Sequence, residues 1–181
     1  KSIIFKLFVF SISLSFIFLI LLNFSGIRLF NSLNLGMTLI SGGGFLPTDN
    51  LNDIISTNFQ KMALILMLVL SMTNFFLIFN FFNKKILLKD HKEDLYLLVL
   101  GIILIFLVLF NNFDILNLII TIFSALSNSG LTLIKSDNDL NLYFLLITIL
   151  GGSLISNTSG IKLARFYILL KITSSEVIKL I

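Results

Sequence analysis

The sequence predicts an all-α integral membrane protein, built as a tandem repeat of a spanning helix, a short re-entrant helix, a glycine-containing loop and a second spanning helix. The first observation is composition: 57% of residues are hydrophobic, 12% are charged, and the mean hydropathy is +1.06. A soluble core of this size cannot bury so many apolar side chains. The second is an internal offset, because Ser41 and Gly44 recur 86 positions later as Ser127 and Gly130. Two glycine loops at one offset indicate two modules that each form one wall of a shared site.

Composition also limits the chemistry that the chain can carry out. The absence of cysteine excludes disulfides and cysteine-based metal sites or nucleophiles. The single histidine, His91, lies in a charged stretch at residues 89–94, where we expect a solvated side chain. A net charge of +4 would favour nucleic acid for a soluble protein, but here the position of each charge matters more than the sum. We therefore expect no catalytic residue, no organic cofactor and no nucleic-acid partner.

The first module is expected to cover residues 1–83. Residues 3–22 are apolar or hydroxyl-bearing almost throughout, enough for one crossing of a hydrocarbon layer about 30 Å thick, and no cleavage site for a signal peptide follows. Residues 27–40 keep a helical pattern but are too few to cross, so a re-entrant helix fits best. Its C-terminal end would direct unpaired carbonyls at the glycine loop. A polar turn then returns the chain to water, and a long helix follows over residues 54–82.

A polar cytoplasmic connection at residues 84–94 leads to the second module, at residues 95–181. Its expected elements are a span at residues 95–110, a short helix at 113–126, a loop at 127–132 and a last helix at about 140–170. Glycines and hydroxyl side chains interrupt that last helix at residues 151–160. Broken backbone at membrane depth is tolerated only where it is buried in protein or lines a wet cavity.

The basic residues predict the orientation of the chain in the cell's inner membrane. Ten of the 13 basic residues gather on one side, which places both termini and the central connection in the cytoplasm and both glycine loops toward the outside. Acidic residues at the outer mouth either concentrate cations or are simply tolerated in outer loops. These acidic residues are Asp49, Asp53, Asp114, Asp137 and Asp139.

The glycine loops have the chemistry of an ion-selectivity filter. A filter needs backbone carbonyls that face inward from a tightly curved chain, and only glycine takes the required dihedral angles without a Cβ penalty. The order of span, half-helix, glycine loop and span is also that of potassium-channel pores. The predicted filter residues are Ser41, Gly42, Gly43, Gly44 and Phe45 in the first loop and Ser127, Asn128, Ser129, Gly130 and Leu131 in the second. Potassium would be held by the backbone carbonyls of Ile40, Ser41, Gly42, Gly43, Asn128 and Ser129.

Over nearly its whole length the chain resembles the TrkH/KtrB/HKT superfamily of potassium-uptake channel subunits. SGGGFLPTD at residues 41–49 looks like the second-module filter of TrkH-type proteins, and SNSGLT at residues 127–132 looks like the third. GGSLISNTSGIKLAR at residues 151–165 resembles the segment that family members use as an intramembrane gate. The resemblance implies these gate residues: Gly151, Gly152, Ser156, Asn157, Thr158, Ser159, Gly160 and Lys162.

The sequence departs from the family pattern in three ways. Leu131 replaces the phenylalanine that commonly follows the third filter glycine, while Phe45 keeps it in the second. The gate segment is usually richer in glycine and smaller in side chain than residues 154–159 are here. Modules resembling the first and fourth of the family are missing, which indicates either a fragment of a longer chain or a half-length protein that dimerises.

Three polar residues each have two interpretations. The ammonium of Lys162 would either lie near the inner cavity and repel or gate cations, or reach the cytoplasmic headgroups with the nearby basic residues. Asn74 and Asn80 would either line the pore or donate hydrogen bonds to neighbouring helices.

The predicted function is potassium uptake across the cytoplasmic membrane by a pore that is not an enzyme. The lipid bilayer is one expected partner. The resemblance implies three more: the missing pore modules of the same subunit, a second copy of the subunit, and a cytoplasmic nucleotide-binding regulatory subunit. One alternative, a proton- or sodium-coupled transporter subunit, predicts ionisable residues within spans, whereas the acids here cluster in loops. Another, a non-conducting membrane assembly protein, predicts no common offset between the glycine loops.

Overall fold

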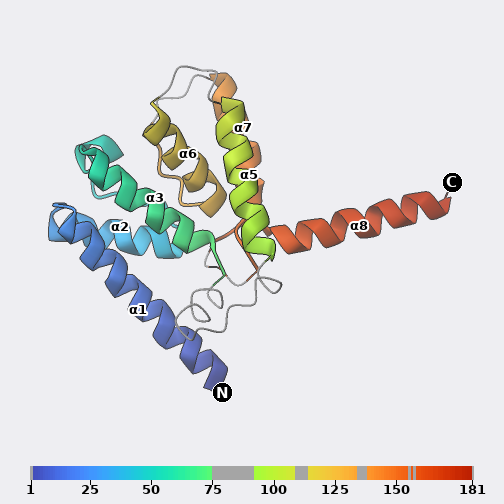
Figure 1. Cartoon of the computed structure of the whole chain (residues 1–181), viewed down its shortest axis with the longest axis horizontal. Helices are drawn as coiled ribbons and strands as arrows, with labels where there is room; N and C mark the ends of the chain where they lie inside the picture. The colour runs from blue at the N-terminus through green and yellow to red at the C-terminus, as the bar shows by residue number, and fades with distance from the viewer. Residues whose placement is uncertain are drawn as a thin grey trace.

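The computed structural model describes residues 2–74, 92–108, 114–133, 138–154, 156 and 158–180. These residues are mostly helical, as the sequence predicts (Figure 1). The first half contains α1 (Ser2–Phe24), α2 (Leu29–Ser41), the 3-10 turn η1 (Leu51–Asp53) and α3 (Asn58–Met72). The second half contains α5 (Lys92–Val108), α6 (Ile115–Ser127), α7 (Asn138–Ile149), β1 (Leu150–Gly151), β2 (Ile161–Lys162) and α8 (Leu163–Leu180). The two short strands pair in parallel.

Helix α6 lies at the centre of the packing. It contacts α3, α5 and α7, and its contact with α3 joins the two halves of the chain. Its residues Leu118 and 120–127 are all buried, because apolar and small hydroxyl side chains occupy every face of the helix. Helix α2 packs mainly against α1 and is buried along one side only. The second short helix is therefore an internal element and the first a peripheral one.

The described helices differ in length from the crossing helices that the sequence predicts. In the part of the chain that the structure describes, no helix combines the length and the apolar character that a complete bilayer crossing requires. The helix expected over residues 140–170 is divided, because α7 ends at Ile149 and α8 begins only at Leu163. The helix expected over residues 95–110 starts earlier, at Lys92, and is described as far as Val108.

Helix α3 begins at Asn58, so the predicted start near residue 54 was wrong. Thr57 caps the helix: its hydroxyl accepts a hydrogen bond from the Gln60 N–H at 3.3 Å, while Gln60 Oε1 accepts one from the Thr57 N–H at 3.2 Å. This capping box satisfies N–H groups that a helix start leaves without an intrahelical partner. Gln60 Nε2 also donates to the Ser25 carbonyl at 3.3 Å, which connects the start of α3 to the turn between α1 and α2.

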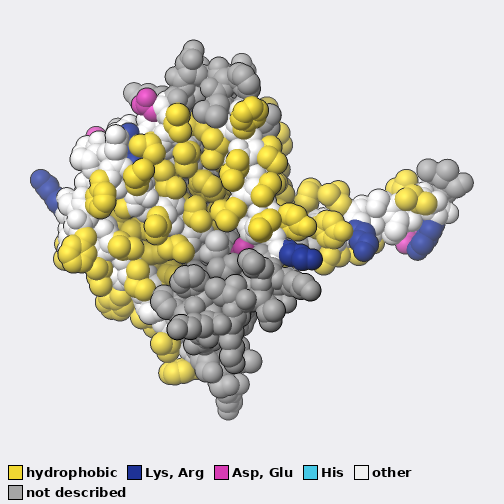
Figure 2. All heavy atoms as spheres, in the orientation of Figure 1, with side chains coloured by type: hydrophobic (Ala, Val, Ile, Leu, Met, Phe, Trp, Pro, Cys, Tyr) yellow, Lys and Arg dark blue, Asp and Glu magenta, His cyan; other side chains and the backbone are white. Residues whose placement is uncertain are grey.

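Large apolar side chains cover much of the surface in Figure 2. Phe24 and Phe45 are 82% and 80% exposed, and further exposed apolar side chains follow α1, α5 and α8. Exposed apolar surface of this extent marks contact with another protein or with lipid.

Replacement of Thr57 by alanine should lower the free energy of unfolding by about 1 kcal/mol, because the helix start loses its side-chain acceptor. Thermal unfolding of the purified protein in detergent measures the change. Thr57→Ser keeps the hydroxyl and is the control, and equal stability of the two variants would show that the cap contributes nothing.

Candidate functional site

The two short helices end in the same way. Helices α2 and α6 each contain 13 residues, and each is followed by a left-handed residue, Gly42 with φ 63° and Asn128 with φ 57°. The next N–H group in each loop donates to the carbonyl five residues earlier, at 3.2 Å from Gly43 and 3.0 Å from Ser129. These bonds are of the Schellman type and satisfy carbonyls at the helix end. Asparagine tolerates the left-handed region better than most residues, which explains its place at 128.

The two loops meet at Gly44 and Ser129. Gly44 and Gly130 both have positive φ, 69° and 67°. A Cβ at Gly44 would lie 2.8 Å from the Ser129 carbonyl oxygen, closer than side chains approach in proteins. A Cβ at Gly130 would meet no atom within 4 Å. Glycine at 44 is therefore required by both backbone conformation and close approach, whereas glycine at 130 is required by conformation alone.

Hydroxyl groups hold both loops, but in different ways. The Thr38 hydroxyl donates to the Phe45 carbonyl at 2.6 Å, which turns that carbonyl toward α2. In the second loop, the Ser129 hydroxyl lies 3.1 Å from that of Ser124 and 3.0 Å from that of Ser127, and all three residues are buried. Buried polar groups that bond to one another stabilise one arrangement of a loop. The second loop is thus held by buried side chains, although its Gly130 is exposed. In the first loop, Ser41, Gly43, Gly44 and Phe45 are all exposed.

The described part of the glycine-rich run between α7 and α8 folds back on itself, and we call it the interrupted segment (residues 150–154, 156 and 158–162). Leu150 pairs with Ile161 and Gly151 with Lys162 as parallel strands. A Cβ at Gly151 would clash with the Ser159 carbonyl oxygen, so glycine is needed for this pairing.

The Lys162 side chain folds back onto the interrupted segment. Its half-buried ammonium donates to the Ser156 carbonyl at 3.2 Å and hydroxyl at 3.1 Å, to the Thr158 hydroxyl at 3.0 Å and to the Thr158 carbonyl. The Thr158 hydroxyl also accepts a bond from the Gly152 N–H at 2.8 Å. The lysine therefore holds the segment closed, a role that neither interpretation from the sequence included.

Two of the described hydrogen bonds connect the interrupted segment to α3 and to the second loop. The Ser153 N–H donates to the carbonyl of Met72, the last residue of α3, at 3.0 Å. Asn128 Nδ2 donates to the Ser159 carbonyl at 3.1 Å. A Cβ at Gly152 would lie 2.7 Å from the Met72 carbonyl oxygen, so glycine lets the segment approach the end of α3. The segment thus bonds to the second loop on one side and to the first half of the chain on the other.

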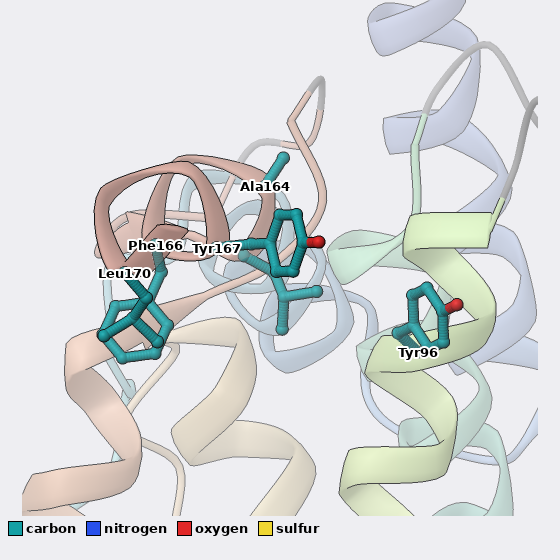
Figure 3. Close-up of a pocket in the computed structure, with 6 residues that line it drawn as sticks. Tyr96, Ala164, Phe166, Tyr167 and Leu170 are labelled. Atoms are coloured by element: carbon teal, nitrogen blue, oxygen red, sulfur yellow. The ribbon is translucent and has the colours of Figure 1, made fainter. Parts of the chain in front are cut away.

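A groove of about 550 Å³ lies between α5 and the start of α8 (Figure 3). Figure 3 shows Tyr96 on α5 across from Ala164 and Tyr167 on α8. The complete lining is Tyr96, Leu163, Ala164, Phe166, Tyr167 and Leu170. This lining is mostly apolar and contains none of the predicted filter or gate residues, so the groove is not part of the candidate site.

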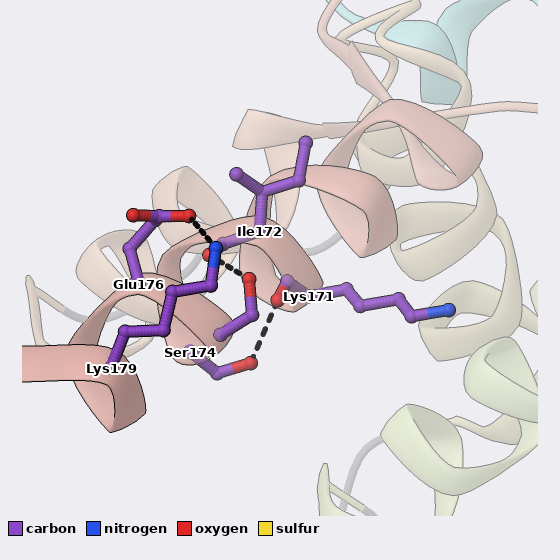
Figure 4. A network of polar contacts seen from close by, with 6 residues as sticks. Lys171, Ile172, Ser174, Glu176 and Lys179 are labelled. Carbon is purple, nitrogen blue, oxygen red and sulfur yellow. Dashed lines mark hydrogen bonds and ion pairs between the residues drawn. The ribbon is translucent and has the colours of Figure 1, made fainter.

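Beyond this groove, α8 projects away from the other helices (Figure 1). Its polar contacts are local: Lys179 pairs with Glu176 at 2.8 Å, and the Ser174 hydroxyl donates to the Lys171 carbonyl at 2.9 Å (Figure 4). Exposed pairs of this kind contribute little to stability. We assign them no role in the site.

The predicted site residues come together only in part. The first and second loops meet, and the second loop bonds to the interrupted segment through Asn128. Predicted residues that lie outside the described ranges include Asn80, His91, Asp137 and Asn157. Sequence reasoning missed Thr38, Met72 and Asp94; of these, only Thr38 had a signal, since it lies 86 positions before Ser124. Within the described ranges, no three His, Cys, Asp or Glu residues are grouped to hold a metal ion.

The fold that these elements form has been seen before in a solved structure. It matches the crystal structure of the potassium transporter TrkH from Vibrio parahaemolyticus with a TM-score of 0.77 and 18% identity, over 97% of this chain and 41% of that one. In sequence, the chain is 28% identical over 168 residues to an uncharacterised cation transporter of Methanocaldococcus jannaschii, which covers 90% of this chain and 34% of the relative. No protein-family profile matches the sequence. The chain therefore spans about a third of the length of the curated relative that it matches.

Gly44→Ala should destabilise the protein more than Gly130→Ala. Both variants place a Cβ on a left-handed residue, at a cost of about 1–2 kcal/mol, but only the first also pushes against a carbonyl oxygen of the other loop. Thermal unfolding of the two purified variants compares them directly. Equal losses would mean that the loops do not approach as closely as described.

Proposed function

We propose that this chain is part of a potassium-uptake protein of the TrkH kind, and that it conducts the ion across the cytoplasmic membrane without catalysis. The observation that carries the proposal is the meeting of two left-handed loops, each at the C-terminal end of a short helix, at Gly44 and Ser129. Helix C-termini carry partial negative charge, and curved backbone presents carbonyl oxygens that replace the hydration shell of a cation. The sequence similarity to a cation transporter and the similarity in fold to the potassium transporter TrkH support the same function.

In this proposal the two loops form two walls of one filter. Potassium is held by the carbonyls of residues 40–43 and 128–129, while hydroxyl groups hold the loops around them. The chain covers 41% of the length of TrkH and 34% of the length of the cation transporter from Methanocaldococcus jannaschii. Both proteins are therefore long enough to contain further modules. We therefore assign it to the second and third of four modules in a longer subunit. A second copy of that subunit and a cytoplasmic nucleotide-binding regulatory subunit are its proposed partners.

The interrupted segment acts as the gate of the proposed pore. It bonds to the second loop through Asn128 and to α3 through Met72, so it lies next to one wall of the filter. When the segment moves aside, the hydrogen bond from the Ser153 N–H to the Met72 carbonyl is broken. A buried polar group left without a partner costs about 1–3 kcal/mol. These bonds therefore favour the closed arrangement by an amount that a bound regulator can overcome.

The proposal is tested with the complete reading frame that contains this chain, reconstituted in liposomes and assayed for potassium and sodium flux. Gly44→Ser and Gly130→Ser should each lower the potassium-to-sodium permeability ratio about tenfold, because a cost of about 1–2 kcal/mol for a left-handed serine shifts the filter carbonyls. Gly36→Ala in α2 is the control, since its Cβ would make an ordinary contact, at 3.7 Å, with the Leu19 backbone nitrogen of α1. Absence of cation flux in the wild type would overturn the proposed function, and unchanged ratios would remove both glycines from the filter.

Lys162→Met should raise potassium flux at unchanged selectivity. The variant keeps a long side chain but removes the bonds that hold Ser156 and Thr158, each worth about 1.5–3 kcal/mol for a charged donor. Flux into liposomes, normalised to the amount of folded protein, measures the change. Lys171→Met, at an exposed lysine of α8, should behave as wild type. An unaltered flux in the Lys162 variant would show that the lysine does not hold the gate.

A further inference from the structure

Two described hydrogen bonds connect the backbone at the C-terminal end of α3 to other elements. The Met72 carbonyl accepts a bond from the Ser153 N–H at 3.0 Å. Two residues later, the Asn74 N–H donates to Asp94 Oδ1 at 2.8 Å. Asp94 lies in the first turn of α5 and is only 3% exposed. One short stretch of backbone therefore contacts both the interrupted segment and a buried carboxylate.

The position of Asp94 determines how the chain leaves α3. Thr73 follows the last residue of α3. It is extended, with φ −76° and ψ 161°, but still bonds into the helix through its N–H to Val69 and its hydroxyl to Leu70. The N–H of the next residue, Asn74, donates to the Asp94 carboxylate. A carboxylate forms a strong, charge-assisted bond to such an N–H, and burial makes departure from that bond costly.

The same stretch forms the surface on which the interrupted segment rests. Gly152 and Ser153 are both buried, and Gly152 leaves no space for a side chain against the Met72 carbonyl. A small rotation of the Met72 peptide would remove the acceptor of the Ser153 N–H, because a hydrogen bond weakens steeply with angle. The contact therefore depends on a fixed direction of the backbone at residues 72–74.

We propose that Asp94 is a positioning residue for the interrupted segment: its carboxylate fixes the end of α3 so that the Met72 carbonyl receives the Ser153 N–H. In this proposal Asp94 acts through the backbone of residues 72–74. The effect on ion flux rests on the proposed function, since it requires the segment to be the gate. The effect on the position of the segment does not.

Hydrogen exchange on the complete protein tests the inference without a transport assay. In Asp94→Ala, amides of residues 150–160 should exchange at least about tenfold faster, the equivalent of about 1.4 kcal/mol, while amides of the second loop at residues 124–133 keep their rates. Asp94→Asn keeps an oxygen acceptor and should show a smaller increase in exchange. This variant replaces Asp94→Ala in the test if the alanine variant does not fold. Unchanged exchange at residues 150–160 in a folded variant overturns the inference.

A double variant separates positioning from general destabilisation. Gly152→Ala should itself push the segment away from Met72. If Asp94 acts through that contact, Asp94→Ala adds no further exchange at residues 150–160 in the Gly152→Ala background. An additive increase would assign Asp94 a general structural role and overturn the inference. A wild-type protein that conducts no cation but shows the exchange pattern would reject the proposed function and leave this inference standing.

Discussion

The close approach of Gly44 to the Ser129 carbonyl is the contact on which the rest of the site depends. It brings together two chain segments far apart in sequence, and it exists because α3 packs on α6 and because a side chain is missing at residue 44. The second loop in turn bonds to the interrupted segment through Asn128. A displacement at this one contact would therefore change the relation of the first loop to every other part of the site.

The polar chemistry of the site is almost entirely that of hydroxyl and backbone groups. Thr38 binds one loop carbonyl, three serines bind one another in the second loop, and Ser156 and Thr158 receive the Lys162 ammonium. In the proposed pore, neutral oxygens of this kind would fix backbone geometry without placing a fixed negative charge beside the path of a cation. An ion that meets only dipoles can enter and still leave, which is the requirement for conduction rather than tight binding.

Local patterns in the sequence predicted the helical class, the resemblance to TrkH in fold and the offset at which the two short helices recur. They did not predict the start of α3, because an apolar run obscures the capping pair Thr57 and Gln60 in the sequence. Asp94 was assigned to a polar connection, and only the return of the chain against α3 shows that it is buried. Such contacts join residues that no periodic pattern relates, so they require the folded structure.

The attachments of the interrupted segment suggest how a gate can be both stable and movable. Its bonds to other parts of the protein, from Ser153 to Met72 and from Asn128 to Ser159, each use at least one backbone carbonyl and involve no large apolar side chain. Water can replace the lost partners of such bonds when the segment is released. The bonds of Lys162 to Ser156 lie within the segment and hold its folded-back shape, on which its closed position also depends in the proposed gate. Shape and attachment are thus controlled by separate residues, so the segment can detach as a unit without first unfolding.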